Sequence, residues 1–348
     1  MKKYRYRGLL AVVMVALLTA GSYGMATNEK IIIKLAHADS TDINISRKQA
    51  MSVTFANLIN GKSGGRLEVQ IFGAGALGGE REYVEAIKAG QVQAGIASGV
   101  ISNFYPEAMV TDIPYLFPSA QIAWQVLDGP FGKKLAEGFN KTTGMRNLAF
   151  GEVGFRHFSN GKHAIHSPKD LQGLKIRVME TPLFMTMMKA MGASPIPVAW
   201  PEVYTALQTG VVDGQENPIG SIISAKLYEV QKYVILDGHV YGVDWFVMND
   251  KFFKSLATDL QRLVLDSAKI AANEERRFVQ VADSNGLQIL TQNKTEVYTP
   301  TAAEMSQFKK LAQQPCIDWM KTKINSKLIN EALKAVKTAE TKAAKENK

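Results

Sequence analysis

Two arginines stand where they could bind an anion. Arg156 lies in the segment Gly154-Phe-Arg-His-Phe-Ser159, and Arg177 lies near the end of the apolar segment Gly173-Leu-Lys-Ile-Arg-Val178. A guanidinium at the end of an apolar strand is partly buried, and its burial without an anion is costly. The partner is either a carboxylate of the protein or a ligand carboxylate, held by two parallel charge-assisted hydrogen bonds in a cleft at the carboxyl ends of parallel strands. The residues around each arginine leave both alternatives open.

A glycine-rich segment, Gly73-Ala-Gly-Ala-Leu-Gly78, has the G-x-G-x-x-G spacing of a dinucleotide-binding turn and follows a predicted strand. Such a site also needs an acidic residue that holds a ribose hydroxyl. The next strand ends in Ala94-Gly-Ile-Ala-Ser98 and supplies none. We therefore predict a tight turn in which glycine provides backbone freedom, and we expect no cofactor.

The sequence contains no recognisable catalytic or metal motif. His157, His163 and His166 are close together, but their segment has a strand-and-turn pattern and lacks the acidic or cysteine residues typical of a metal site, so we expect no metal. Cys316 is the single cysteine, and its apolar surroundings favour a buried structural thiol over a nucleophile. No nucleophile has a base nearby, which predicts a protein that is not an enzyme. A catalytic triad assembled from residues distant in sequence is the alternative.

The N-terminus has the pattern of an exported protein. Lys2, Lys3, Arg5 and Arg7 precede the apolar run Leu9 to Ala20, which small residues follow, so we interpret residues 1–26 as a signal peptide that is removed in the periplasm. A retained N-terminal anchor is the alternative, but the run is shorter than the about 20 residues that span a bilayer. The formal charge of +9 arises largely from this segment and from lysines in the tail, and we expect no nucleic-acid partner.

Predicted strands and helices alternate along the chain, which indicates an α/β fold with largely parallel sheets. The pattern begins with a strand at 31–36, a helix, a strand at 67–72, a helix at 80–88 and a strand at 94–98, and it restarts after residue 152. The length allows two lobes. An almost uninterrupted helical pattern from Thr258 to about Asn293 predicts a helix on the order of 50 Å long that lies along both lobes.

A series of motifs resembles the solute receptors of TRAP transporters of the DctP type. The stretch from Gly192 to Pro218, which includes Trp200-Pro-Glu-Val-Tyr and Gln215-Glu-Asn-Pro, is the most similar, and Gly173-Leu-Lys-Ile-Arg-Val178 also matches. Further similar segments are Leu77-Gly-Gly-Glu-Arg81, Tyr105-Pro-Glu-Ala, Ile113-Pro-Tyr-Leu-Phe117 and Tyr228-Glu-Val-Gln-Lys232. The likeness covers nearly the whole chain after the signal peptide, in order.

This resemblance implies a two-lobed, class II periplasmic-binding-protein fold whose lobes close over an organic acid, with the long helix spanning both lobes. We divide the chain into lobe I (28–153 with 243–282), lobe II (154–242 with 283–330) and a Lys-rich helical tail (331–348). In the tail, lysines interspersed with Ala, Thr and Glu predict a solvated, fraying helix. The resemblance implies that Arg177 grips the ligand carboxylate, that Arg156 and Asn217 also contact the ligand, and that Trp200 closes over it. The alternative roles are an exposed strand residue for Arg156, a turn former for Asn217 and a helix-start residue for Trp200.

The family pattern is least specific in lobe I. His37, Asp39 and Ser98 follow predicted strands, and Tyr241 is near a lobe crossing, so these four are candidate contacts. An Asp39 that faces the ligand would favour hydroxyl-bearing acids over a second carboxylate, because like charges repel. We expect a monomeric periplasmic receptor that delivers a small organic anion to a TRAP membrane permease. The first expected ligand class is a C4-dicarboxylate, and the next is a sugar acid or an aromatic or keto acid. The alternatives are a secreted enzyme on the same fold and a receptor that signals to a membrane sensor.

Overall fold

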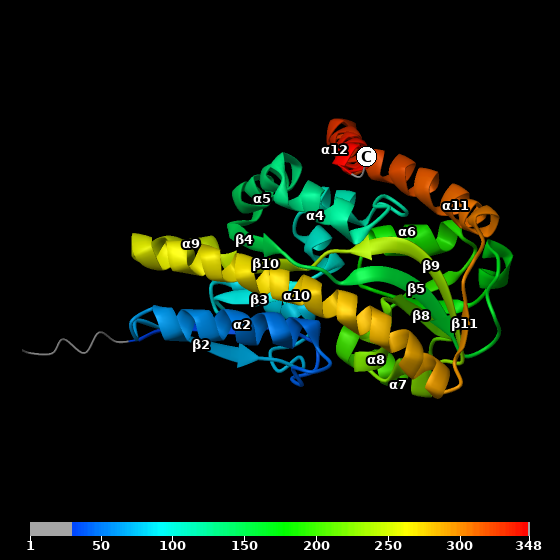
Figure 1. Cartoon of the computed structure of the whole chain (residues 1–348), viewed down its shortest axis with the longest axis horizontal. Helices are drawn as coiled ribbons and strands as arrows, with labels where there is room; N and C mark the ends of the chain where they lie inside the picture. Colours follow the sequence, from blue (N-terminus) through cyan, green and yellow to red (C-terminus); the bar gives the residue numbers. More distant parts are fainter. Residues whose placement is uncertain (1–29, 347–348) are drawn as a thin grey trace, which may run out of the picture.

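The computed structural model describes residues 30–346, which form two α/β lobes lying side by side (Figure 1). The predicted signal peptide lies outside the described residues. One lobe is built on a five-stranded sheet and the other on a six-stranded sheet; they are called lobe I and lobe II below. The two-lobed α/β arrangement agrees with the predicted fold class.

The lobe I sheet has the strand order β2-β1-β3-β10-β4. Its strands are β1 (Ile31–Ala36), β2 (Leu67–Phe72), β3 (Ala94–Ala97), β4 (Met145–Phe150) and β10 (Trp245–Asn249). The first three strands are parallel, whereas β10 is antiparallel to both β3 and β4. The prediction of largely parallel sheets is therefore wrong in part, because a strand from late in the chain is inserted between β3 and β4.

The lobe II sheet has the order β11-β9-β5-β8-β6-β7. Its strands are β5 (Gly154–Asn160), β6 (Lys175–Val178), β7 (Ser194–Pro197), β8 (Gly214–Asn217), β9 (Tyr233–Gly242) and β11 (Glu296–Tyr298). The pairs β6 with β7, β6 with β8, and β9 with β11 are parallel, whereas β5 is antiparallel to both of its neighbours. This sheet is mixed as well.

Helices connect the strands and cover the sheets. The α-helices are α2 (Arg47–Lys62), α3 (Glu80–Ala89), α4 (Ala120–Asp128), α5 (Pro130–Thr143), α6 (Pro182–Ala190), α7 (Val203–Gln208), α8 (Ile219–Ser224), α9 (Asp250–Ser255), α10 (Thr258–Gln292), α11 (Ala302–Lys321) and α12 (Ser326–Glu346). Short 3-10 helices are η1 (Gly99–Asn103), η2 (Pro106–Asp112), η3 (Pro168–Leu171), η4 (Trp200–Glu202) and η5 (Leu227–Glu229). Between residues 30 and 346, no helix is both long enough and apolar enough to cross a membrane.

Three segments before α11 cross from one lobe to the other. Residues 151–153 join β4 to β5, residues 243–244 join β9 to β10, and α10 passes along both lobes (Figure 1). The 35-residue α10 packs on α2 and β4 of lobe I and on α8 and β11 of lobe II. The prediction of a long helix that spans both lobes is confirmed.

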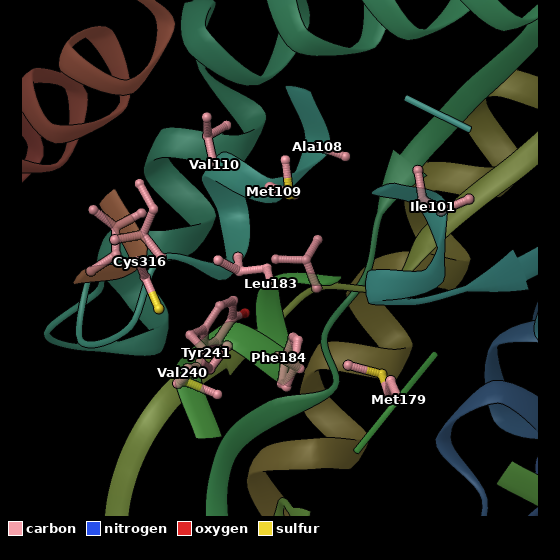
Figure 2. Close-up of a cluster of buried hydrophobic side chains, with 14 of the residues drawn as sticks. Ile101, Ala108, Met109, Val110, Met179, Leu183, Phe184, Val240, Tyr241 and Cys316 are labelled. Carbon is pink, nitrogen blue, oxygen red and sulfur yellow. The ribbon is translucent and has the colours of Figure 1, made fainter. Parts of the chain in front are cut away.

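The two lobes share a continuous apolar core on the side of α4, α6 and α11. Figure 2 shows Ile101, Met109 and Phe184 among the side chains that η1, η2 and α6 contribute to this core. Tyr241 of β9 and Cys316 of α11 belong to the same cluster. Burial raises the pKa of the Cys316 thiol to about 12, which is consistent with the predicted structural thiol.

The Lys-rich tail is part of the folded body. α12 buries Ile329, Ala332, Val336 and Ala339 and packs against α4, α5 and η2, while α11 packs against α6 and β9. The expectation of a solvated, frayed tail is therefore wrong for its described residues. Alanine among the lysines allows close packing along one helix face, and the lysines occupy the other face.

Candidate functional site

A cleft lies between the two lobes where the carboxyl ends of their parallel strands meet. The free space between its side chains is about 460 Å³, including the part that is open to solvent. The lining residues are Asp39, Arg47, Glu80, Ser98, Val100 and Val153 on one side, and Arg156, Arg177, Met179, Glu180, Ala199, Trp200, Asn217 and Ser221 on the other. In an open α/β sheet, the loops after parallel strands form the edge at which ligands bind.

Arg177 is a buried cation without an acidic partner. Its side chain projects from β6, is 2% exposed, and donates from Nε and Nη2 to the carbonyl of Val198 at 2.9 and 2.7 Å. Its Nη1 has no hydrogen-bond partner, and no carboxylate of residues 30–346 lies within 4.0 Å of the guanidinium. Burial lowers the pKa of Arg177 to about 10, so the group is charged at neutral pH. An anion in the cleft would satisfy both the charge and the free donor.

Arg156 also lines the cleft, but its charge is balanced inside the protein. Its Nε and Nη2 donate to the two carboxylate oxygens of Glu216 at 2.5 and 2.9 Å, and Nη2 also reaches the Glu216 carbonyl at 2.6 Å. This is a buried two-point ion pair between β5 and β8. The alternative of an internal carboxylate partner therefore holds for Arg156.

A histidine extends this ion pair away from the cleft. His239 Nε2 lies 3.2 Å from Glu216 Oε2, and its Nδ1 lies 2.9 Å from Asp237 Oδ2. Burial opposes the charge on the imidazole, but the carboxylates of Asp237 and Glu216 outweigh it and raise the pKa of His239 to about 9. The chain of four alternating charges fixes the position of Arg156 at the wall.

Asn217 and Trp200 lie on either side of Arg177. Asn217, the last residue of β8, donates from Nδ2 to Gln215 Oε1 at 2.6 Å, and that bond fixes the orientation of its amide. The ring centroid of Trp200 is 5.7 Å from the Arg177 guanidinium carbon, within cation–π range. The indole is only partly buried, so its face is available to cover a ligand bound at Arg177.

Lobe I contributes a second cation, Arg47, that is fully engaged with the protein. Its Nη1 donates to Asp39 Oδ2 at 3.0 Å and its Nε donates to Asp244 Oδ2 at 2.9 Å. The same Nη1 reaches Ser221 Oγ of α8 in lobe II at 3.1 Å. Arg47 therefore bridges the lobes across the floor of the cleft.

A buried lysine completes the lobe I wall. Lys48 forms an ion pair with Glu80 and lies 3.4 Å from Asp244 Oδ1. Burial opposes its charge, but Asp244 and Glu80 outweigh this effect and raise the pKa of Lys48. Glu80 also accepts hydrogen bonds from the backbone and hydroxyl of Ser98, at 2.9 and 3.0 Å from its Oε2.

The structure brings six of the eight predicted site residues to the cleft: Arg177, Arg156, Asn217, Trp200, Asp39 and Ser98. His37 and Tyr241 do not line it. His37 is buried behind the turn after β2, where its Nε2 contacts Gln49 Oε1 at 2.7 Å, and Tyr241 bonds to Trp124 Nε1 at 3.0 Å in the shared core. His37 follows β1 and Tyr241 lies near the crossing after β9, as expected, but both side chains are buried in the packed interior.

Sequence reasoning missed Arg47 and Glu80. Glu80 is the first residue of α3, and its side chain turns toward Ser98 and the cleft. The signal that could have located it is the preceding turn, in which Gly75 and Gly78 have φ of 71° and 92° and bring the start of α3 close to the cleft. Positive φ favours glycine, so the predicted tight turn is confirmed.

The cleft is closed in this structure, because several contacts join its two rims. Besides Arg47 with Ser221, the Nδ2 of Asn103 donates to the carbonyl of Glu180 at 2.8 Å. Met179 Sδ lies 3.5 Å from Ser98 Oγ. Within the part of the chain that the structure describes, no group of three His, Cys, Asp or Glu side chains could hold a metal ion.

Comparisons with known proteins agree with this geometry. Residues 38–322 match the family described as bacterial extracellular solute-binding protein, family 7, the DctP family. A solute-binding protein of Verminephrobacter eiseniae is 45% identical over 235 residues, which cover 67% of this chain and 70% of that protein. The chain therefore belongs to the DctP family of TRAP-transporter solute-binding proteins.

Solved structures of relatives superpose over most of the chain. The sugar acid binding protein DctPAm of Advenella mimigardefordensis, in complex with galactonate, is 32% identical, with a TM-score of 0.85 and coverage of 89% of this chain and 99% of that chain. A TRAP periplasmic solute-binding protein of Sulfurospirillum deleyianum with bound succinate is 30% identical, with a TM-score of 0.81 and coverage of 86% and 97%. The predicted family and the two-lobed binding-protein fold are confirmed.

Proposed function

We propose that this protein is the extracytoplasmic receptor of a TRAP transporter and that it binds a small organic carboxylate through Arg177. One observation carries the proposal: the guanidinium of Arg177 is buried in the cleft with no carboxylate partner and with a free Nη1 donor. A buried unpaired cation is unfavourable in the empty protein, so it favours the state in which an anion is bound. The family relationship supports a role in transport.

Capture requires binding and closure but no covalent chemistry. The ligand carboxylate pairs with Arg177, Asn217 offers an amide beside it, and Trp200 covers the ion pair with an apolar face that excludes water. Closure then adds the contacts of Arg47 with Ser221 and of Asn103 with Glu180. The closed, liganded form docks on the membrane permease and releases the acid there.

The same proposal places the mature protein in the periplasm as a monomer, after removal of residues 1–26. It assigns residues 28–153 with 243–282 to the moving unit of lobe I and residues 154–242 with 283–330 to that of lobe II. Relatives are described with galactonate and with succinate, so the family alone leaves both sugar acids and C4-dicarboxylates as ligand classes.

A thermal-shift screen tests the proposal. Sugar acids, C4-dicarboxylates, keto acids and aromatic acids are added to the purified mature protein, and the bound class should raise Tm because a ligand stabilises the state that it binds. Arg177→Ala should abolish the shift while the unliganded variant stays folded. Arg81→Ala, which removes an exposed arginine of α3, is the matched control and should keep the shift.

Three results would contradict this function. No response to any carboxylate would exclude the carboxylate receptor, and normal binding by Arg177→Ala would show that the arginine is structural. Conversion of the bound acid, detected by product analysis after incubation, would favour the secreted enzyme. A receptor that feeds a membrane sensor would bind the acid but fail to support its uptake by cells that contain the permease.

A further inference from the structure

The cleft has only one anchor for a carboxylate. Three arginines line it, but Arg47 is held by Asp39 and Asp244, and Arg156 is held by Glu216. Among the described residues that line the cleft, Arg177 alone is a cation without a carboxylate within 4.0 Å. A second carboxylate on the ligand would have to displace one of the buried internal pairs, which is costly.

The lobe I wall of the cleft, which faces Arg177, carries an excess of negative charge. In lobe I, three carboxylates, Asp39, Glu80 and Asp244, surround the two cations Arg47 and Lys48. Burial, with the nearby carboxylate of Asp244, raises the pKa of Glu275 well above its ordinary value. Ionisation of the Glu275 carboxyl would only increase the excess of negative charge on this wall.

This wall lies within electrostatic range of the anchor. Of the carboxylates that act on the Arg177 guanidinium, Glu216 and Glu180 belong to lobe II, and Glu80 acts on it from lobe I across the cleft. A ligand whose carboxylate binds Arg177 therefore directs its far end toward Glu80, Asp39 and Ser98. Carboxylate oxygens accept hydrogen bonds from hydroxyl groups and repel a second carboxylate.

We propose that the ligand is a hydroxylated monocarboxylate, with its single carboxylate on Arg177 and its hydroxyl groups donating to Asp39 and Glu80 of lobe I. This inference rests on the proposed function. It reverses the order expected from the sequence, in which a C4-dicarboxylate came first. The reason is that pairing within the protein leaves one free cation and an acidic wall facing it.

The experiment compares ligands that differ in one group. Erythronate and meso-tartrate share their carbon chain and two hydroxyls, but tartrate has a second carboxylate in place of the terminal CH₂OH; galactonate and galactarate form the corresponding six-carbon pair. Affinities are measured by isothermal titration calorimetry on the mature protein at pH 7.5. We expect the monoacid of at least one pair to bind about tenfold or more tighter than its diacid, because of like-charge repulsion in a partly desolvated site.

A charge variant tests the cause. Glu80→Gln removes the excess negative charge from the lobe I wall. The ratio of monoacid affinity to diacid affinity should therefore fall by roughly tenfold. Glu85→Gln makes the same change five residues further along α3, where Glu85 is exposed and paired with Arg81, and should leave the preference unchanged. If Glu80→Gln fails to fold, Asp39→Asn serves as the second variant with the same expected direction.

The outcomes separate this inference from the proposed function. The inference is overturned if the diacid binds at least as tightly as its monoacid in both pairs, or if no member of either pair binds. Tight binding of succinate or of an aromatic acid that Arg177→Ala abolishes would leave the receptor function intact and contradict only the ligand class. An unchanged preference in both Glu80→Gln and Asp39→Asn would show that the lobe I wall does not set it.

Discussion

The carboxylate of Glu216 bonds to both Nε and Nη2 of Arg156, at 2.5 and 2.9 Å, across two antiparallel strands of lobe II. The pair separates the roles of the two cleft arginines that the sequence presents as equivalent. Arg156 is a fixed part of the wall, whereas Arg177 has a free Nη1 donor and no carboxylate within 4.0 Å among the described residues.

Breaking this pair should destabilise the protein. Glu216→Gln leaves Arg156 buried without its counter-ion, and loss of one partner of a buried ion pair costs about 3 kcal/mol. Urea unfolding of the unliganded protein measures the change. Glu137→Gln, at an exposed position of α5, should stay within about 0.5 kcal/mol of the wild type. Equal stability of the two variants would mean that the ion pair contributes nothing.

The charge on His239 should make stability depend on pH. Its pKa is raised from 6.5 to about 9 in the folded state, so its contribution is complete below pH 6.5 and is lost as the pH rises through 9. The loss is on the order of 3 kcal/mol. Burial also raises the pKa of Glu152 from 4.5 to about 7, so its contribution to stability is lost as the pH rises from 4.5 to 7, and the window from pH 7 to 9 reports on His239.

His239→Gln is the variant for this measurement. Free energies of unfolding between pH 7 and 9 should decline in the wild type and stay nearly level in the variant. An equal decline in both proteins would assign the effect to another group.

The bond from Arg47 to Ser221 should favour the closed form. Ser221→Ala removes a hydrogen bond that joins the lobes, and such a bond to a charged group contributes about 1.5 kcal/mol, or roughly a tenfold loss of affinity. The loss should appear as faster ligand dissociation in stopped-flow experiments. Ser224→Ala, in the same helix, removes only a bond to the Ser221 carbonyl and should leave dissociation unchanged. Similar dissociation rates in the wild type and both variants would show that the bond from Arg47 to Ser221 does not stabilise the closed form.

The C-terminal helix should contribute to the stability of the whole protein. Ile329 of α12 is 1% exposed, and its replacement by alanine should cost about 3 kcal/mol through lost burial and a residual cavity. Lys334→Ala changes an exposed residue of the same helix and should be nearly neutral. Thermal unfolding distinguishes them, and a neutral Ile329→Ala would indicate that the helix is not held on the body.

The sequence by itself determined the local elements. The first strands, the turn at Gly75 and Gly78 and the long helix α10 follow from periodicity and from glycine at positive φ, which are properties of short segments. Arg177 was one of two arginines that the sequence placed at the ends of apolar strands, where a guanidinium needs an anion; its role as the ligand anchor was implied by the family resemblance and stays a prediction.

Only the tertiary structure decided which charges are free. Arg156 and Glu216 are 60 residues apart, and Arg47 and Asp244 are 197 apart, so no local pattern could show that these arginines are already paired. Nor could it show that Glu80 faces the cleft while His37 and Tyr241 face the interior. Charge balance in a cleft depends on side chains brought together from distant strands and helices. That balance distinguishes Arg177, which has no carboxylate partner among the described residues, from Arg47 and Arg156, which are already paired.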